Sequence, residues 1–170
     1  SKFDMLKGYW QIELSPRGKE ISCFTTLGQT YKCNVMPYGM TNCPATYQRM
    51  MNDLTADIAG CVVYIDDVII FSNTWEEHLE RMESFLKKLA EANLVVNLSK
   101  CEFVKARVLY LGHVIGQGTV APPQAKVEAI CKVSVPRNKR ELRRFLGMVG
   151  YYRRYIVNFA TVLAPLTELL

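Results

Sequence analysis

The chain has 170 residues and a net charge of +5; 49% of its residues are hydrophobic and 22% are charged. This length suits one globular domain with a small appendage, and the hydrophobic share excludes an intrinsically disordered chain because it suffices for a core. No apolar run approaches the roughly 18 residues that a membrane-spanning helix needs, so we expect no membrane partner.

The beginning of the chain favours strands. Residues 2–6 and 8–14 show the pattern of half-buried strands, and residues 15–19 (S-P-R-G-K) indicate a turn after them. The residues that follow predict a hairpin about a Gly28-Gln29 turn. Because the chain starts without Met and already inside a strand pattern, we expect a fragment of a longer polypeptide.

A loop over residues 36–43 leads into a helix. Pro44 suits the first turn of that helix, where a missing N–H costs nothing. Apolar side chains follow at helical spacing, at Tyr47, Met50, Met51 and Leu54.

Residues 61–71 (C-V-V-Y-I-D-D-V-I-I-F) contain two adjacent carboxylates, Asp66 and Asp67, between apolar β-branched flanks. Each flank is too short for a helix, so the segment predicts a strand, a tight turn and a second strand. The Asp pair would lie at the turn, where Asp is a common residue in any case. Because the flanks are apolar enough for central strands, we expect the pair to face the edge of a cleft.

A longer helix follows this hairpin. Thr74 and Glu77 form a capping-box pattern at its start, and Asn93 marks its end. We expect His78 to be solvated on an acidic face of this helix. The predicted apolar face consists of Leu79, Met82, Leu86 and Leu89.

The last part of the chain begins with strand patterns, over residues 94–98 and in a hairpin over 107–120 that turns at 116–118. Pro122-Pro123 separates these from two helical segments, the second of which begins at Asn138. The alternation of hairpins and helices predicts an α+β fold, with an antiparallel or mixed sheet and helices on one face. The Pro-Pro pair is the expected subdomain boundary.

Positive charge is concentrated in the same C-terminal part. Residues 126–154 carry nine basic and two acidic side chains, a net charge of +7 that leaves −2 for the rest of the chain. This asymmetry favours contact with a polyanion at one end, although a solvated helix face is the alternative.

The spacing of the cysteines favours an intracellular chain. Six cysteines include no C-x-x-C pair, which argues against a zinc site. Reduced thiols are the preferred interpretation, and three disulfides are the alternative.

A third carboxylate, Asp4, lies at the end of the first predicted strand, between apolar neighbours. If that strand pairs beside the later hairpin, Asp4, Asp66 and Asp67 converge. Adjacent carboxylates repel one another and are stabilised by divalent cations, and oxygen ligands of this kind suit Mg²⁺. Two such ions about 4 Å apart can align an attacking and a leaving oxygen for in-line displacement at phosphorus.

Five blocks occur in this order: F-D-M-L-K-G-Y-W-Q-I, M-P-Y-G-M-T-N-C-P-A-T-Y-Q-R-M-M-N, V-V-Y-I-D-D-V-I-I-F-S, K-C-E-F with Y-L-G-H-V-I, and R-F-L-G-M-V-G-Y-Y-R-R-Y-I. Together they resemble the reverse transcriptase of gypsy-type LTR retrotransposons, over essentially the whole chain. The resemblance implies an RNA-directed DNA polymerase with a right-hand fold. Residues 1–121 would be its ferredoxin-like palm, and residues 122–170 would begin its basic helical thumb. Most of the fingers, RNase H and integrase would lie outside this chain, so we expect the fragment alone to be inactive.

The resemblance also implies catalytic roles. Asp4, Asp66 and Asp67 would bind two Mg²⁺ ions, with Mn²⁺ as a substitute. At this centre a primer 3′-oxygen would attack the α-phosphorus of a dNTP. Lys100 would protonate the leaving pyrophosphate, although a surface lysine is the alternative.

The same resemblance implies contacts with nucleotide and nucleic acid. The residues expected to bind the dNTP are Tyr9, Pro37, Tyr38 and Gly39. The residues expected to contact an RNA or DNA template with its primer are Tyr64, the primer-grip residues Leu111, Gly112 and His113, and the basic residues Lys139, Arg140, Arg143 and Arg144.

Two other classes of function stay open. One is a domesticated palm that binds nucleic acid without catalysis, against which the intact acid triad argues. The other is a different two-metal enzyme such as a nucleotide cyclase, against which the predicted primer grip and basic thumb argue. We expect an intracellular location, in a cytoplasmic retrotransposon particle, with the nucleus as an alternative.

Overall fold

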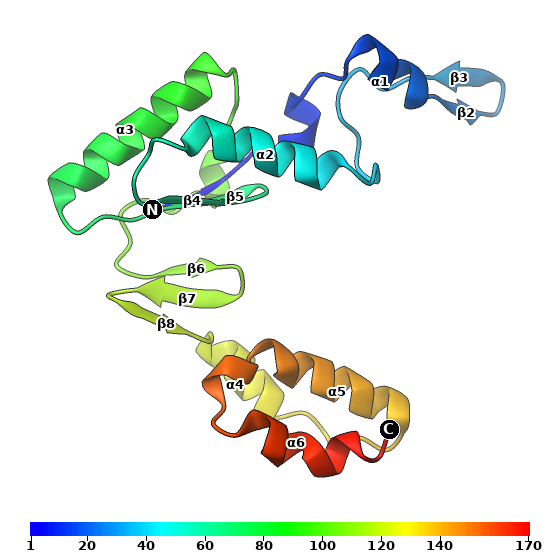
Figure 1. Ribbon diagram of the computed structural model, residues 1–170, viewed down its shortest axis with the longest axis vertical. Coiled ribbons are helices and arrows are strands. Elements are labelled where there is room, and N and C mark those ends of the chain that lie inside the picture. Colours follow the sequence, from blue (N-terminus) through cyan, green and yellow to red (C-terminus); the bar gives the residue numbers. More distant parts are fainter. The chain divides into compact units, whose positions relative to one another are not determined.

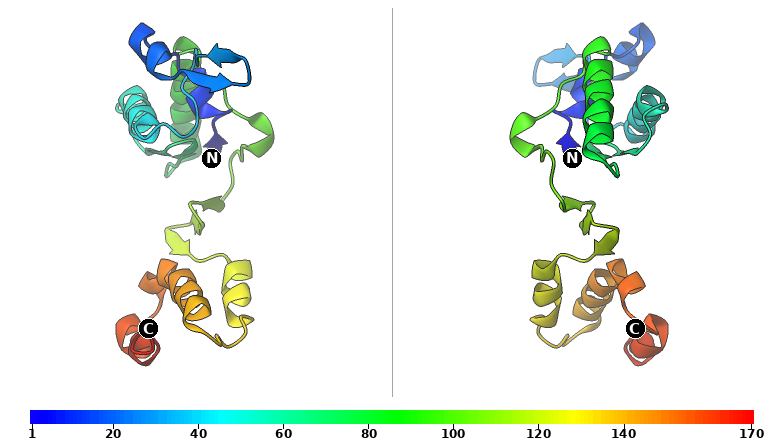
Figure 2. Two further views of the ribbon diagram at one scale, coloured as in Figure 1. Left: turned by 90° about the vertical axis from the view of Figure 1, so that its right-hand side faces the viewer. Right: turned by 90° about the vertical axis from the view of Figure 1, so that its left-hand side faces the viewer.

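A computed structural model describes residues 1–170, and the chain forms two compact units, residues 1–105 and 106–170 (Figure 1, Figure 2). The sequence prediction drew its boundary later, at Pro122-Pro123. The hairpin that we assigned to the palm therefore lies in the second compact unit. The boundary between palm and thumb after residue 121 stays a prediction, because compactness alone does not define either subdomain.

The first unit contains a three-stranded antiparallel sheet in the order β1 (Lys2–Asp4), β5 (Asp67–Ile70), β4 (Cys61–Tyr64). The β4–β5 hairpin confirms the strand–turn–strand prediction for the Asp-Asp segment. Phe3 and Val68 are partners across β1 and β5, and both are fully buried. Because side chains alternate along each strand, the sheet has one apolar face and one partly exposed face.

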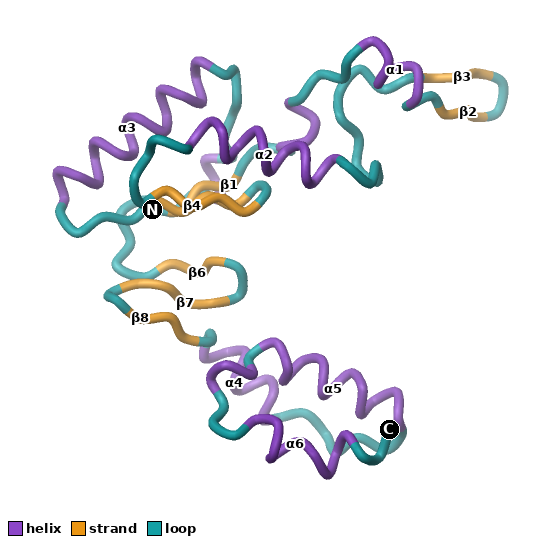
Figure 3. Tube along the Cα trace, in the orientation of Figure 1, coloured by secondary structure: helices purple, strands orange, loops and turns teal.

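Two helices cover the apolar face, α2 (Cys43–Thr55) and α3 (Trp75–Glu91), as the tube in Figure 3 shows. Pro44 occupies the first turn of α2, as predicted. This arrangement confirms the α+β prediction with helices on one face of a sheet. The fully buried members of the shared core are Phe3, Met5, Tyr47, Met51, Val68, Ile70 and Phe85.

The buried face of α3 agrees only in part with the predicted one, because Leu89 is buried and Met82 packs against the core, as predicted, but the other two residues of that face are not buried. Leu79 and Leu86 are 45% and 41% exposed, whereas Phe85 is fully buried and His78 is 8% exposed. The Phe85 ring packs edge-on against Phe3, with ring centroids 4.9 Å apart. Because this aromatic pair fills the space above the sheet, the helix turns the two leucines outward. The expectation that His78 is solvated was wrong.

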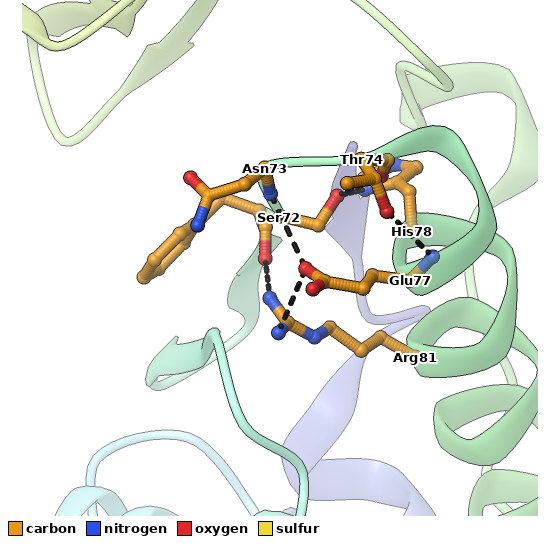
Figure 4. Close-up of polar contacts among 7 residues, drawn as sticks. Ser72, Asn73, Thr74, Glu77, His78 and Arg81 are labelled. Atoms are coloured by element: carbon orange, nitrogen blue, oxygen red, sulfur yellow. Dashed lines mark hydrogen bonds and ion pairs between the residues drawn. The ribbon is translucent and has the colours of Figure 1, made fainter.

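Hydrogen bonds at the start of α3 explain why a histidine is buried there (Figure 4). His78 Nδ1 lies 3.1 Å from Ser72 Oγ, and its Nε2 lies 2.8 Å from Ser1 Oγ. Both ring nitrogens therefore have partners, which removes most of the cost of burial. Thr74 Oγ1 accepts from the Glu77 N–H at 3.3 Å, which confirms the predicted cap.

The first 35 residues depart most from the prediction. The predicted second strand is a 3-10 helix, η1 (Gly8–Gln11), which follows a left-handed Lys7 with a φ of 50°. The predicted turn after it is helix α1 (Pro16–Ile21), capped by Ser15. A serine cap followed by proline at the first helical position is a helix-start signal that the turn interpretation overlooked.

The predicted early hairpin is confirmed, as β2 (Phe24–Thr26) and β3 (Gln29–Tyr31). Its turn lies at Leu27-Gly28, one residue before the predicted position. Gly28 has a φ of 99°, and this left-handed conformation decides where the turn forms.

The segment after α3 is not the predicted strand. Only Val96 pairs there, through an isolated bridge to Met5, and the 3-10 helix η2 (Leu98–Lys100) follows. The Asn97 N–H donates to the Asp4 carbonyl at 2.7 Å, so this segment still lies along β1.

The second unit begins with an antiparallel sheet of β6 (Val108–Tyr110), β7 (His113–Gly116) and β8 (Thr119–Ala121). The turn predicted around Gly116–Gly118 joins β7 to β8 and is confirmed. A further turn at Leu111-Gly112 joins β6 to β7, so the predicted hairpin is a three-stranded meander.

Helices α4 (Gln124–Cys131), α5 (Lys139–Tyr151) and α6 (Phe159–Thr167) complete the second unit, with the 3-10 helix η3 (Arg153–Tyr155) after α5. The predicted start of α5 is confirmed, because Asn138 Oδ1 accepts from the Glu141 N–H at 2.9 Å. Helix α6 was not predicted. None of the helices combines the length and the apolar character needed to cross a bilayer.

Replacement of Phe85 by Ala should lower the free energy of unfolding by about 3–5 kcal/mol, because it removes a fully buried ring. Leu86→Ala on the next residue is the matched control, and its half-exposed side chain should cost below about 1 kcal/mol. Urea titrations of both variants measure the two losses. Equal losses would show that the predicted face of α3, rather than the observed one, packs on the sheet.

Candidate active site

Two predicted acidic residues lie opposite each other on the partly exposed face of the β1–β5–β4 sheet. Phe3 and Val68 point into the core, so their neighbours Asp4 and Asp67 point the other way. The register pairs Asp4 with Asp67, which puts their Cα atoms about 4.5–5.5 Å apart. Tyr64 is the partner of Asp67 on β4 and is 53% exposed. Three predicted site residues thus form one row across the sheet.

The third acid, Asp66, lies in the two-residue turn between β4 and β5. Its neighbour Ile65 has a φ of 51°, a left-handed conformation that costs a β-branched residue on the order of 1–3 kcal/mol. Gln48 of α2 holds this turn, since its Oε1 accepts from the Ile65 N–H at 2.7 Å and its Nε2 donates to the Val63 carbonyl at 3.1 Å. The Met5 N–H donates to the Asp66 carbonyl at 2.9 Å and ties β1 to the turn.

One carboxylate oxygen of Asp66 is buried and has no hydrogen-bond partner. Burial raises the pKa of Asp66, the charges of Asp4 and Asp67 raise this pKa further, and Lys100 opposes them. A buried, unpaired carboxylate is costly, so this group of three acids, the acid cluster, is a place where a cation would be stabilising.

Gly8 provides the space beside that oxygen. A β-carbon at position 8 would overlap Asp66 Oδ1 and would lie 2.6 Å from the Tyr47 hydroxyl oxygen. The Tyr47 hydroxyl is also buried without a partner, and burial together with the Asp66 charge raises its pKa. Neither residue was predicted to belong to the site. The sequence holds one signal for Gly8, since a glycine inside an apparent strand indicates close approach of another group.

Two lysines flank the acid cluster. Lys100 Nζ lies 3.7 Å from Asp4 Oδ1, and Lys2 Nζ lies 3.4 Å from Asp67 Oδ1. Lys100, a predicted catalytic residue, is therefore beside the acids, with a side chain that is 65% exposed. Lys2 was not singled out from the sequence, because a lysine at a strand start is common on any protein surface.

The acid cluster fits the requirements of Mg²⁺. No three acidic, histidine or cysteine side chains gather closely enough to hold an ion by themselves. Mg²⁺ does not need such a cage, because it is held by one or two carboxylates together with substrate phosphates and water. The unpaired oxygen of Asp66 and the neighbouring carboxylates supply donors of this kind.

Aromatic side chains lie next to the acid cluster. The Tyr9 ring contacts those of Tyr38 and Tyr47, with centroids 5.4 Å apart in each case. Trp10 contacts Tyr38 at 5.7 Å, and Lys7 Nζ lies 4.7 Å from the centre of the Trp10 ring. Burial raises the pKa of Tyr9, and the negative charge of Asp66 adds to this effect. The structure thus brings two predicted dNTP-binding residues, Tyr9 and Tyr38, together beside the acids.

The loop before α2 presents Tyr38. The Pro37 carbonyl accepts a hydrogen bond from Cys43 Sγ at 3.5 Å, which fastens the loop to the first residue of the helix. Gly39 has a φ of 96°, a conformation that other residues rarely adopt. Pro37 and Gly39 therefore determine the path of the loop that carries the tyrosine.

The remaining predicted residues belong to the second unit. Leu111 and Gly112 form the turn before β7, and His113 is the first residue of that strand. On α5, Leu142 and Val149 are buried within the second unit. The predicted basic residues of α5 are all exposed: Lys139, Arg140, Arg143 and Arg144.

Residues 1–115 match the protein family described as "Reverse transcriptase (RNA-dependent DNA polymerase)". The retrovirus-related Pol polyprotein from transposon 297 of Drosophila melanogaster is 40% identical over 169 residues, which cover 98% of this chain and 16% of that polyprotein. The corresponding polyprotein from transposon gypsy of the same species is 36% identical over 170 residues, with 98% and 16% covered. The transposon Tf2-3 polyprotein of Schizosaccharomyces pombe is 31% identical, and the match covers 100% of this chain and 13% of the polyprotein. The chain thus spans about a sixth or less of the length of these relatives.

Solved structures of a foamy viral protease–reverse transcriptase are also similar. The dRH form in complex with double-stranded DNA has a TM-score of 0.93 and 30% identity, over 99% of this chain and 30% of that chain. The complex with an RNA/DNA hybrid has a TM-score of 0.89 and 30% identity, over 99% of this chain and 23% of that chain.

Asp66→Asn should stabilise the chain in metal-free buffer at neutral pH, because it removes a charge that burial and two neighbouring acids disfavour. The folded-state pKa of Asp66 is raised, so wild type loses stability as pH rises from the unfolded to the folded pKa. The stability advantage of Asp66→Asn should therefore disappear at pH values below both the unfolded-state and the folded-state pKa. A gain of about 1 kcal/mol would raise the Tm by about 2–4 °C for a chain of this size.

Calorimetry of wild type, Asp66→Asn and the control Asp53→Asn, an exposed acid on α2, measures this effect. Added MgCl₂ should raise the Tm of wild type and of the control more than that of Asp66→Asn. A metal-free Tm of Asp66→Asn at or below that of wild type would contradict the electrostatic interpretation.

Proposed function

The chain belongs to the reverse transcriptase (RNA-dependent DNA polymerase) family, and on this premise we propose that it forms the palm and the first part of the thumb of a retrotransposon polymerase. Residues 1–121 would be the palm and residues 122–170 the start of the thumb. The proposed activity of the complete enzyme is RNA-directed synthesis of DNA. The fingers, RNase H and integrase would come from other parts of a polyprotein, since the relatives are polyproteins far longer than this chain.

The acid cluster carries this proposal. Asp4 and Asp67 are partners across β1 and β5, Asp66 interacts electrostatically with both, and one oxygen of Asp66 is buried without a partner. Carboxylates that repel one another and are partly buried lower the stability of the fold. Their presence therefore favours a functional role over a structural one. Asp4, Asp66 and Asp67 would hold two Mg²⁺ ions, or Mn²⁺ in their place. When bound, these ions would align the attacking and leaving oxygens and offset the charge of the triphosphate.

Lys100 is proposed as the proton donor. Its ammonium group lies 3.7 Å from Asp4 Oδ1, and this ion pair would hold it near the phosphates of a bound dNTP. An ammonium group has three N–H donors and no acceptor, which suits a group that gives a proton to the leaving pyrophosphate. Its exposed side chain leaves room for the movement that the transfer requires.

Tyr9 and Tyr38 are proposed to bind the dNTP. The Tyr9 ring contacts both Tyr38 and Tyr47, and these contacts would restrain its position. A ring fixed beside the sugar would leave no room for a ribose 2′-hydroxyl and would favour dNTPs over rNTPs. Pro37 and Gly39 would contribute by holding the loop.

A primer paired with an RNA or DNA template is the proposed macromolecular partner. The similar foamy viral enzymes were solved with double-stranded DNA and with an RNA/DNA hybrid. We propose cytoplasmic particles as the location, with the nucleus as an alternative. The residues proposed to contact the duplex are Tyr64, the primer-grip residues Leu111, Gly112 and His113, and the basic residues Lys139, Arg140, Arg143 and Arg144 of α5.

Asp66→Asn should reduce primer extension by at least about 100-fold, because even the outer-shell partners of a metal site contribute 10–100-fold. The assay uses a polypeptide that contains this chain together with its fingers, and it follows Mg²⁺-dependent extension of a labelled primer. Asp53→Asn should extend the primer at the wild-type rate. Extension by Asp66→Asn at that rate would refute the assignment, and a wild type that binds duplex without extending it would favour the catalytically silent palm.

Duplex affinity should fall as salt concentration rises, because contacts of basic side chains with phosphates release counterions. Arg143→Gln/Arg144→Gln removes two exposed charges from α5 and should reduce the slope of log affinity against log salt by about 1.8. Lys87→Gln, on the exposed side of α3, should leave that slope unchanged. Fluorescence anisotropy at several salt concentrations measures the slopes. A wild-type slope in the double variant would remove α5 from the duplex interface.

A further inference from the structure

A strained turn joins β6 to β7 in the second unit. Leu111 has a φ of 46° and Gly112 a φ of 72°, so both turn residues are left-handed. Two-residue hairpin turns of this kind favour Asn-Gly, because leucine tolerates the conformation poorly. A leucine persists in such a conformation only when its surroundings hold it there.

Two consecutive tyrosines keep the turn in this conformation. The Tyr151 hydroxyl donates to the Leu111 carbonyl at 2.6 Å, and the Tyr152 hydroxyl donates to the Gly112 carbonyl at 3.2 Å. Both carbonyls of the turn are therefore satisfied by side chains from one short segment. A β-carbon at Gly112 would lie 3.1 Å from the Tyr151 hydroxyl oxygen, so the tyrosine also fits closely over the glycine.

His113 adds a third connection. Its Nδ1 lies 3.1 Å from the Tyr155 hydroxyl oxygen. Its ring stacks on that of Tyr151 with centroids 5.4 Å apart and planes 7° apart, and it meets Tyr152 edge-on. The Arg154 guanidinium lies 4.8 Å from the centre of the Tyr155 ring. Burial and the Arg154 charge lower the pKa of His113, which favours the neutral imidazole.

We propose that Tyr151, Tyr152 and Tyr155 are positioning residues that fix the Leu111–Gly112 turn to the end of the basic helix α5. Tyr151 is the last residue of α5, and the exposed basic residues lie in the first half of the same helix. When those basic residues bind duplex phosphates, the Leu111–Gly112 turn would be positioned together with them. The inference rests on the proposed function, because it takes the turn to contact the primer.

The proposal explains why the segment Y-Y-R-R-Y carries three tyrosines. Aromatic packing alone would be served by phenylalanine, whereas all three hydroxyls here have partners on the turn or on His113. The hydroxyl groups are thus the part of these side chains that a positioning role requires. Phenylalanine substitutions test this role without removing the rings.

Tyr151→Phe/Tyr152→Phe is the test variant. Tyr31→Phe is the matched control, since the hydroxyl of this exposed residue bonds the Gln29 side chain away from the turn. In the 170-residue chain, each lost hydroxyl bond should speed amide hydrogen exchange in the peptide 108–116 by about threefold to tenfold. Exchange in the control should match wild type. Unchanged exchange in the double variant would overturn the proposal.

The same variants are then compared in primer extension by the longer polypeptide that includes the fingers. The fraction of bound primer extended in the first turnover should fall about tenfold, because a misplacement on the order of 1 Å can cost up to about 10²-fold. Duplex affinity, its salt slope and the KM for dNTP should stay within about twofold of wild type.

The remaining outcomes separate two failures. If duplex affinity falls in parallel with extension, the tyrosines are merely structural and the proposal is overturned. Faster exchange with extension at the wild-type level would also overturn it. A wild type that extends no primer would refute the proposed function itself, which the exchange experiment does not depend on.

Discussion

The burial of Phe3 determines the arrangement of the first unit. Its ring is enclosed by Phe85 of α3 and by Phe103, with centroids 4.9 and 5.4 Å away. Because side chains alternate along a strand, a Phe3 anchored in the core forces Asp4 onto the opposite face. Val68 does the same for Asp67 on the neighbouring strand. A hydrophobic contact on one side of the sheet thereby brings two negative charges together on the other, and the core and the candidate site have a common cause.

Unfavourable features concentrate around the Asp66 turn. Ile65 adopts a left-handed conformation that glycine would adopt without strain, and Asp66 has a buried oxygen that no donor satisfies. Selection for stability alone would favour other residues at both positions. The turn persists because the Gln48 side chain, on the well-packed helix α2, forms hydrogen bonds with the Val63 carbonyl and with the Ile65 N–H. Strain that is held in place by a rigid neighbour is typical of a functional site, where local stability is lost to keep reactive groups together.

Elements with local signals were predictable from the sequence. Short β-branched flanks and an Asp-Asp turn predicted the β4–β5 hairpin, and Pro44, Thr74 and Asn138 marked helix starts correctly. The buried face of α3 was predictable only in part, because leucines and an aromatic residue compete for one core. Only the position of Phe3, more than 70 residues earlier in the chain, decides between them.

The candidate site likewise contains residues that could be predicted from the sequence and residues that could not. The three acids and Tyr64 could be predicted, because motifs name them and strand register then brings them together. Gln48 could not be predicted, and the only signal for Gly8 was a glycine inside an apparent strand, because each residue acts on a partner far away in the sequence. A glutamine on a helix is ordinary until the strand turn beneath it is known.

The pairing of β1 with β5 has a genetic consequence. An in-frame insertion of one codon between Phe3 and Asp4 would leave every acidic residue encoded, yet with Phe3 still anchored it would direct the Asp4 carboxylate toward the apolar core. An insertion of two codons would return the Asp4 carboxylate to the correct face of the sheet, but at the wrong distance from the Asp66 turn. A gene copy with such a lesion would keep an open reading frame and the V-V-Y-I-D-D block, yet Asp4 and Asp67 would no longer share one face of the sheet. A genome inventory based on that block alone would therefore overestimate how many copies encode the complete acid cluster.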